Sequence, residues 1–314
     1  MSYASTGLIQ ATDYNAMAWG GTQGTYTASP TNIAYVMGVG ASAVGYGQDV
    51  TAINTVAAAG TVTATQWSGL LTTLNKALGH QSGAGAQLSV PTITAGGVIT
   101  YAATVATAVT TINTNAALYA ANGSTLTGTT FTTAISSTTG VNQSIYRSVT
   151  FPSTQAARYF FNAGGYLNYY TSVTGGTGSA ANNSLTNMVN AIGGLTGFRN
   201  TANNGRTGSG LTLNTNNTAF GYRNLLLNAG TNVIYVTDTA AAYTADNAQL
   251  IIWTNNNDAT SGANGPTVIF ELHINVADHS WDDSISCTVN TRVDVVYPES
   301  TYLTTNSWGT PSIT

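Results

Sequence analysis

Apolar residues recur at helical spacing between Gly60 and Gly79. Five of them fall at i, i+3, i+4, i+7 and i+11 and so share one helical face: Trp67, Leu70, Leu71, Leu74 and Leu78. We expect Thr65 to cap the start of this helix, because its hydroxyl can accept from a free backbone N–H. Gly79 is expected to end it. The pattern predicts an amphipathic helix over 65–78.

The start of this stretch repeats a frame found near the N-terminus. GLIQATDYN at 7–15 and GTVTATQWS at 60–68 both read Gly, any residue, Ile or Val, any residue, Ala-Thr, Asp or Gln, an aromatic, then Asn or Ser. In the first copy we expect Thr12 to cap a shorter helix that stops at the following Gly-Gly pair. Gln66 stands where the first copy has Asp13, so the frame does not require an acid. It predicts a helix start that the chain uses twice.

A third periodic segment follows the Gly-rich stretch that contains Pro91. Its apolar residues are spaced 3-4-3-4-3, the seam of a short coiled coil: Ala102, Val105, Val109, Ile112, Ala116 and Tyr119. Thr and Val form helices poorly, so this helix needs packing partners. In one interpretation the partners are identical helices of neighbouring copies. In the other, the helix packs inside its own domain.

From about Val141 the apolar period changes from 3.6 to 2. Apolar and polar residues alternate through 267–276 and again through 285–295, with the turn-rich DHSWDD between them. We interpret these two runs as a hairpin with one buried face. Further strands are expected at 148–151, 158–162, 166–172, 222–228, 233–237 and 249–254, with one short helix at 185–192.

These patterns predict an α+β fold. A helical N-terminal attachment and oligomerisation region is expected over 1–90, with the repeated frame in it. A linker and a coiled-coil-like helix are expected over 91–145. An antiparallel β-sandwich of jelly-roll type is expected over 146–314, because many short strands are separated by Gly and Asn turns.

Charge is sparse along the whole chain. Only 6% of the residues are Asp, Glu, Lys or Arg, against about 25% in ordinary soluble domains. The net charge of −4 offers no basic field for nucleic acid or anionic lipid, so neither is expected as a partner. The single cysteine, Cys287, excludes an intramolecular disulfide. We see no apolar run of membrane-spanning length and no secretory signal pattern.

The densest group of potential metal ligands surrounds the expected hairpin. It comprises Glu271, His273, Asp278, His279 and Asp282. Imidazole nitrogens and carboxylate oxygens can hold a divalent cation. No helical H-x-x-x-H or EF-hand spacing supports such a site, however, and an exposed strand face next to a turn explains the residues as well. We therefore predict no metal and no cofactor.

Motifs of catalysis are also missing from the sequence. There is no G-x-S-x-G elbow, the glycines of TGGTGSAANNS lack the Lys-Ser/Thr of a P-loop, and Cys287 has no partner motif. We predict that the protein is not an enzyme. An alternative of that class is a polysaccharide depolymerase acting through Asp282 or Asp283. The aromatic stretch RYFFNAGGYLNYY is interpreted as sandwich core, with a carbohydrate-stacking surface as the alternative.

The repeated frame, GYGQ at Gly45–Gln48 and the GHQSG that ends the second copy resemble virion structural proteins of tailed bacteriophages, particularly marine and cyanobacterial phages. RYFFNAGG at Arg158–Gly165, NVIYV and the two closing alternating runs look like the C-terminal region of the same group. The resemblance covers most of the chain and brings no catalytic residue with it. The chain departs from the group by an insertion between the first helix and GYGQ.

The resemblance implies a tail fibre, baseplate or neck appendage, located in the virion after assembly in the host cytoplasm. The alternatives are a receptor-binding module for host polysaccharide and a capsid-surface fibre or decoration protein. Expected partners are further copies in a homotrimer, other virion proteins and a host cell-surface glycan. Copies of symmetric appendages meet through apolar helix faces. Seven residues are expected to make that contact: Trp67, Leu70, Leu71, Leu74, Val105, Val109 and Ile112.

Overall fold

The chain is described from a computed structural model, which covers residues 9–20, 32–40, 44–89, 102–240, 243–255, 257–258, 263–279 and 284–314. It forms two compact units. We call them the helical unit, formed by 1–123, 158–164 and 298–308, and the sandwich unit, formed by 124–157, 165–297 and 309–314. The helical unit thus takes two short segments from the C-terminal half of the chain.

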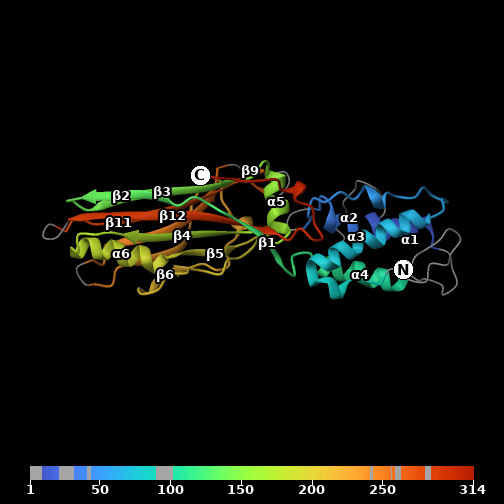
Figure 1. The fold of residues 1–314 in the computed structure, drawn as a ribbon, viewed down its shortest axis with the longest axis horizontal. Helices are drawn as coiled ribbons and strands as arrows, with labels where there is room; N and C mark the ends of the chain where they lie inside the picture. The colour runs from blue at the N-terminus through green and yellow to red at the C-terminus, as the bar shows by residue number, and fades with distance from the viewer. Residues whose placement is uncertain are drawn as a thin grey trace. The chain divides into compact units, whose positions relative to one another are not determined.

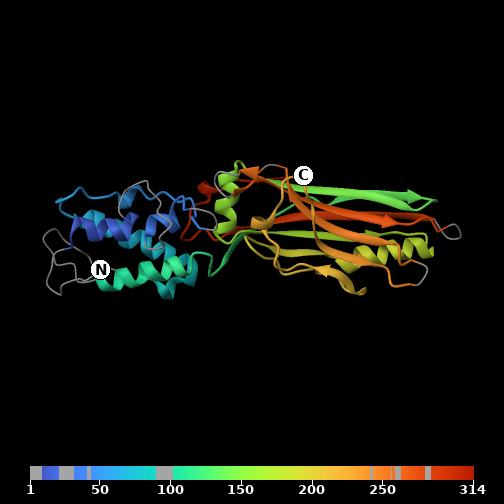
Figure 2. The same ribbon diagram turned by 180° about the vertical axis from the view of Figure 1, so that it is seen from behind.

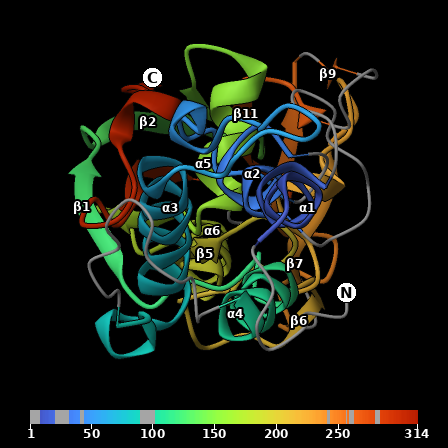
Figure 3. The same ribbon diagram turned by 90° about the vertical axis from the view of Figure 1, so that its right-hand side faces the viewer.

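Four α-helices lie side by side in the helical unit (Figure 3). They are α1 (Ala11–Trp19), α2 (Ile33–Met37), α3 (Ala64–Ser82) and α4 (Ala102–Thr114), with short 3₁₀ turns η1 (Thr51–Ile53), η2 (Ala84–Ala86) and η4 (Thr305–Ser307). The predicted apolar face of α3 is buried in this unit, as are Val105, Val109 and Ile112 of α4. None of the helices that the structure describes is long and apolar enough to cross a membrane.

The predicted helix at 65–78 is confirmed as α3, but both of its predicted ends were wrong. Thr63 is the N-cap, and it forms a capping box in which the Gln66 N–H donates to Thr63 Oγ1 over 3.2 Å and the Thr63 N–H donates to Gln66 Oε1 over 2.9 Å. Thr65 already lies in the first turn. The helix also continues through Gly79 to Ser82. A threonine followed by glutamine at N3 satisfies two free donors, which makes it the stronger start.

The other two helices also differ from prediction at their ends. The N-cap of α1 is Gln10, without a side-chain cap, and Thr12 lies inside the helix; α1 stops at Gly20 as predicted. α4 ends at Thr114, before the predicted Tyr119. Within the interval 91–145, the described residues form α4, β1 (Asn122–Thr127), β2 (Phe131–Ser137) and the start of the strand Val141–Thr150.

The sandwich unit consists of two antiparallel sheets (Figures 1 and 2). Sheet A has the order β1-β12-β4-β5, with β2 also on β12; sheet B has the order β13-β3-β11-β8-β7-β6. The remaining bounds are β3 (Val141–Thr150), β4 (Tyr166–Thr174), β5 (Gly194–Phe198), β6 (Leu213–Asn216), β7 (Thr231–Thr237), β8 (Asn247–Thr254), β11 (Thr267–Val276), β12 (Ile285–Pro298) and β13 (Ser312–Ile313), beside the small pair β9 (Asn257–Asp258) and β10 (Ala263–Asn264).

The predicted fold class is confirmed: helices lie mostly in the N-terminal part and antiparallel strands in the C-terminal part. As in a jelly roll, successive strands repeatedly change sheet, for example from β2 to β3 and from β3 to β4. Between the sheets, the Tyr169 ring of β4 stacks on the Phe270 ring of β11 with centroids 5.5 Å apart. The predicted short helix is α6 (Ala180–Ile192), which contacts strands of both sheets and closes one side of the core (Figure 1).

The predicted hairpin of the two alternating runs was wrong. β11 pairs with β3 and β8 in sheet B, whereas β12 pairs with β2 and β4 in sheet A. The predicted alternation itself is confirmed, since the apolar positions of both strands are buried. Alternation identifies the buried face of a strand. It does not say in which of two facing sheets that strand lies.

Two predicted strands are also wrong. Residues 158–162 lie in helix α5 (Thr154–Asn162), and residues 222–224 form the 3₁₀ turn η3 (Tyr222–Asn224). Ser153 starts α5, because its Oγ accepts from the Ala156 N–H over 3.0 Å. The neighbouring Phe160 and Phe161 are both buried. A strand could not bury two adjacent side chains on one face, but a helix can.

Candidate functional site

The segments that carry the sequence motifs come together in the helical unit. GYGQ at 45–48, GHQSG at 79–83 and RYFFN at 158–162 are distant in the chain, and the segment after β12 joins them. We call this cluster the motif node. Side-chain hydrogen bonds and a ring contact join four of its members directly: Tyr46, His80, Gln81 and Glu299. Its other members bond backbone carbonyls in or beside the GYGQ loop: Gln48, Arg158 and Asn162.

Helix α3 supplies His80 and Gln81 to the node from its last turn. It reaches them because it does not stop at Gly79, where the ring of Tyr302 lies directly against the helix. A Cβ at Gly79 would stand 2.5 Å from Tyr302 Cε1. The glycine is therefore needed here for close packing and not as a helix end.

The GYGQ loop pairs with the end of α2. The Tyr46 N–H donates to Val36 O over 2.9 Å, and the Gln48 N–H donates to Met37 O over 2.7 Å. Gly47 has φ +68°, and a Cβ there would stand 2.4 Å from Cδ2 of Tyr159. Any other residue would adopt a strained backbone conformation here, and its Cβ would clash with the Tyr159 ring.

The Tyr46 side chain lies in the centre of the node. Its hydroxyl donates to Ala116 O over 2.8 Å and accepts from Nε2 of Gln81 over 3.0 Å. Its ring stands edge-on to His80, with centroids 4.9 Å apart. Burial raises the pKa of Tyr46 above its usual value, so the phenol keeps its proton and acts as a donor.

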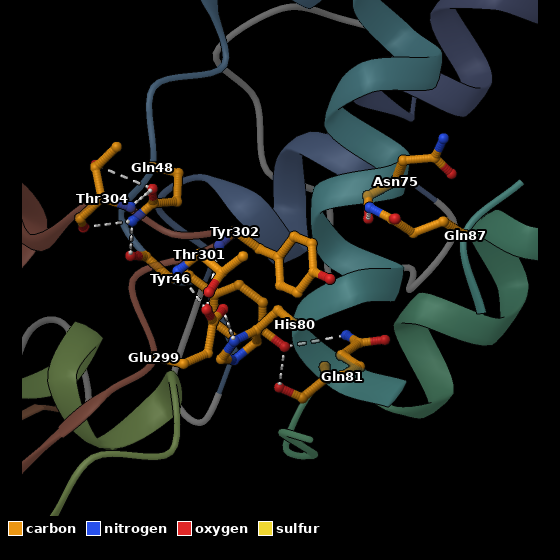
Figure 4. Close-up of polar contacts among 11 residues, drawn as sticks. Tyr46, Gln48, Asn75, His80, Gln81, Gln87, Glu299, Thr301, Tyr302 and Thr304 are labelled. Atoms are coloured by element: carbon orange, nitrogen blue, oxygen red, sulfur yellow. Dashed lines mark hydrogen bonds and ion pairs between the residues drawn. The ribbon is translucent and has the colours of Figure 1, made fainter. Parts of the chain in front are cut away.

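His80 and Glu299 pair inside the node (Figure 4). His80 Nδ1 lies 3.0 Å from Oε1 of Glu299, and both side chains are buried. The other carboxylate oxygen, Oε2, accepts from the backbone N–H groups of Thr301 and Tyr302. Burial on its own would raise the pKa of Glu299, but the His80 hydrogen bond and the two N–H donors outweigh it and hold this pKa below its usual range.

Gln48 ties the loop to the same late segment. Its Oε1 accepts from the Thr304 N–H over 2.8 Å (Figure 4). Its Nε2 donates to Oγ of Ser307 over 2.8 Å. The side-chain amide of Gln48 carries both an acceptor and donors, so it can bond a backbone N–H and a hydroxyl at the same time. With the His80–Glu299 pair, this holds 298–308 in the helical unit at two places.

The RYFFN motif enters the node from α5. Arg158 Nη2 donates to Val39 O over 2.6 Å, and Asn162 Nδ2 donates to Gly45 O over 3.1 Å. Arg158 is 1% exposed. Both side chains therefore satisfy backbone carbonyls around the glycine loop.

The interpretation of RYFFNAGGYLNYY as sandwich core was wrong for its first part, because Phe160 and Phe161 are buried in the helical unit, and right for Leu167 and Tyr169, which are buried in the sandwich unit. Because both phenylalanines are buried, they offer no carbohydrate-stacking surface.

The polar groups of the motif node are enclosed in the fold and do not form an open site. His80 is completely buried and the Glu299 side chain is 7% exposed, so no substrate reaches either group in this conformation. The other members mostly bond backbone groups. Sequence reasoning singled out His80 but missed Glu299, which lies just beyond the last alternating strand and gives no local signal of its partner.

The weak metal candidates fall into separate places. On sheet B, His273 Nδ1 lies 3.9 Å from Oε1 of Glu271, and Ser144 Oγ contacts both side chains. His279 Nε2 lies instead 3.0 Å from Oδ1 of the buried Asp246, a partner that sequence reasoning missed.

Of the two remaining candidates, Asp278 is exposed, and Asp282 lies outside the described residues, as does Asp283. Within the part of the chain that the structure describes, no group of three or more His, Cys, Asp or Glu side chains is placed to hold a metal ion.

The residues expected to join copies are already buried in the single chain. Their exposed fractions are at most 3%, and they form the core of the helical unit: Trp67, Leu70, Leu71, Leu74, Val105, Val109 and Ile112. A contact between copies would therefore have to use other residues.

Taken together, the predicted site residues do not form one site. The motif node brings distant motifs together, and its polar groups bond to one another and to backbone groups inside the fold. Comparison with known proteins finds no matching family model, no matching curated protein and no matching solved structure.

Proposed function

We propose that this chain is a structural component of a tailed-phage virion: a tail fibre, baseplate or neck appendage that assembles in the host cytoplasm. The observation that carries this proposal is the motif node. The motifs on which the resemblance to phage virion proteins rests are the segments that interlock there, through Tyr46, His80 and Arg158. A sequence motif whose residues lock a fold together suits a structural protein better than an enzyme.

In this proposal the helical unit provides attachment and the copies form a homotrimer alongside other virion proteins. The apolar residues of α3 and α4 that were expected to join copies are buried within each chain. The copies therefore meet through exposed residues of the helical unit. The sandwich unit is presented to the outside. A capsid-surface fibre or decoration protein is the same proposal at another position on the particle.

Light scattering after size-exclusion chromatography tests the assembly. The intact chain at micromolar concentration is expected to elute with three times the 32.2 kDa mass of one chain. A stable monomer under these conditions would contradict assembly through the chain's own contacts. A receptor-binding role is a second candidate function, because the outer face of sheet B has a pocket lined by Tyr146 and Trp253.

A further inference from the structure

The outer face of sheet B carries two aromatic rings at its centre. Tyr146 on β3 and Trp253 on β8 lie on either side of β11, where they pair with Glu271 and Ile269. Their ring centroids are 5.9 Å apart and the planes meet at 81°. Tyr146 is 51% exposed. Successive side chains of a strand point to opposite faces of the sheet. Ile145 and Ile252, which precede the two rings, are buried in the core, so the rings point outward.

A shallow pocket of about 330 Å³ lies beside these rings. Its lining is apolar at the two rings and Ile269, and otherwise mostly neutral and polar: Ser148, Thr150, Asn255, Thr267 and Thr314. Of the lining side chains, only that of Arg147 carries a charge. Its Nε donates to Thr291 Oγ1 over 2.7 Å, and its guanidinium stands 4.2 Å from the centre of the Phe131 ring.

The hydroxyls of the lining bond to each other in two pairs, Ser148 Oγ with Thr314 Oγ1 over 2.7 Å and Thr150 Oγ1 with Thr267 Oγ1 over 3.1 Å. A hydroxyl has one donor and two acceptor positions, so each keeps capacity for a further hydrogen bond. The pocket therefore offers rings, hydroxyls and an amide.

Tyr146 is held in place from the side. Its hydroxyl lies 3.4 Å from Oε1 of Glu271, the oxygen to which Ser144 Oγ also donates. Ser144 Oγ is in turn 3.0 Å from Nδ1 of His273. A ring whose orientation is fixed before binding loses less conformational entropy when a ligand stacks on it.

We propose that this pocket binds a neutral saccharide. The aliphatic C–H face of a sugar ring matches the aromatic faces, and its hydroxyls match the Ser, Thr and Asn groups. Specific small-ligand sites combine an apolar platform with a few placed polar groups in this way. A charged ligand finds no matching free charge in the lining. This inference goes beyond the proposed structural role, which needs no ligand at this face.

The test uses the full chain on an array of bacterial surface polysaccharide fragments together with neutral glucose, galactose and mannose oligomers. The strongest neutral oligosaccharide is then titrated while tryptophan fluorescence is recorded. Trp253→Ala and Tyr146→Ala are each expected to raise the Kd about tenfold or more, as truncation of stacking side chains does elsewhere. Tyr170→Ala is the matched control. It removes the same type of ring from the outer face of sheet A and is expected to leave the Kd within about twofold.

Circular dichroism checks that each variant is folded, and Trp253→Phe replaces Trp253→Ala if the latter is not; it keeps a ring and should weaken binding less. The proposal is overturned if no neutral saccharide binds with a Kd below about 1 mM. It is equally overturned if binding survives both ring deletions, or if only charged polysaccharides bind. None of these results affects the mass measured by light scattering, so the structural proposal is tested separately.

Discussion

Nδ1 of His80 lies 3.0 Å from Oε1 of Glu299, although the two residues are 219 positions apart in the chain. One comes from the end of α3 and the other from the segment that follows β12. This pair, with Tyr46 beside it, joins the N-terminal motifs to the C-terminal part of the chain within one unit. Bringing such distant residues together costs chain entropy. The hydrogen bonds of the buried pair must offset this cost, because an unbonded buried polar group would add to it.

Replacing Glu299 with glutamine should weaken the fold and remove part of its acid sensitivity. The pKa of Glu299 is lowered in the folded state, so the ionised form is favoured there. The stability from this shift is present above the unfolded pKa of about 4.3 and is lost as the pH falls through the lower folded value. At neutral pH, loss of the charge-assisted bonds should cost about 1.5–3 kcal/mol.

Urea unfolding of the wild type and of Glu299→Gln measures this difference in the free energy of unfolding. It is carried out at neutral pH and at a pH below about 4. The gap between wild type and Glu299→Gln should shrink as the pH falls. A gap that stays constant with pH would mean that the carboxylate makes no specific contribution.

Gly47→Ala should destabilise the helical unit by about 2–4 kcal/mol. The new Cβ would stand 2.4 Å from the Tyr159 ring at a φ of +68°. Gly85→Ala is the matched control, because a Cβ there meets nothing within 4 Å, and it should change the free energy of unfolding by less than about 1 kcal/mol. Chemical denaturation compares the two variants. Equal effects would show that the GYGQ loop is not packed as described.

The capping box makes a prediction that separates two neighbouring threonines. Thr63→Ala should cost about 1 kcal/mol, because Gln66 N–H loses its partner. Thr65→Ala lies in the exposed first turn of α3 and should be neutral or stabilise by a few tenths of a kcal/mol. Thermal unfolding followed by circular dichroism distinguishes them. The reverse order of effects would place the helix start at Thr65.

Ile112→Ala tests whether the α4 seam is internal. Ile112 is completely buried in the single chain, so its truncation should destabilise by about 2–5 kcal/mol. The neighbouring exposed Thr111→Ala should change stability by less than about 0.5 kcal/mol. If the seam is internal, the loss of Tm for Ile112→Ala is the same at about 1 µM and about 100 µM protein. A loss that shrinks at the higher concentration would instead indicate contact between copies.

Local patterns predicted which residues are buried, and long-range structure decided the rest. The 3.6-residue period of α3 and the alternation in β11 and β12 follow from side-chain geometry, so they can be predicted from the sequence. Which sheet each strand joins depends on pairing between distant segments. β1 and β2 were missed because NGSTLT and FTTAISS hold too few large apolar residues for a clear period.

The candidate site was less predictable than the fold. GYGQ, His80 and RYFFN could be singled out as motifs, but their meeting around Tyr46 could not, since each motif bonds mainly backbone atoms of another segment. Asp246 gave no signal of its bond to His279. The Tyr146–Trp253 pair became visible only through the register of β3, β11 and β8.

The structural proposal implies that a tailed phage encodes this chain, and quantitative mass spectrometry of purified particles of that phage is its most direct test. The structural proposal predicts that its peptides co-purify with intact virions in a fixed ratio to the major capsid protein, one consistent with a symmetric appendage. Peptides found only in the soluble lysate, and absent from washed particles, would contradict it.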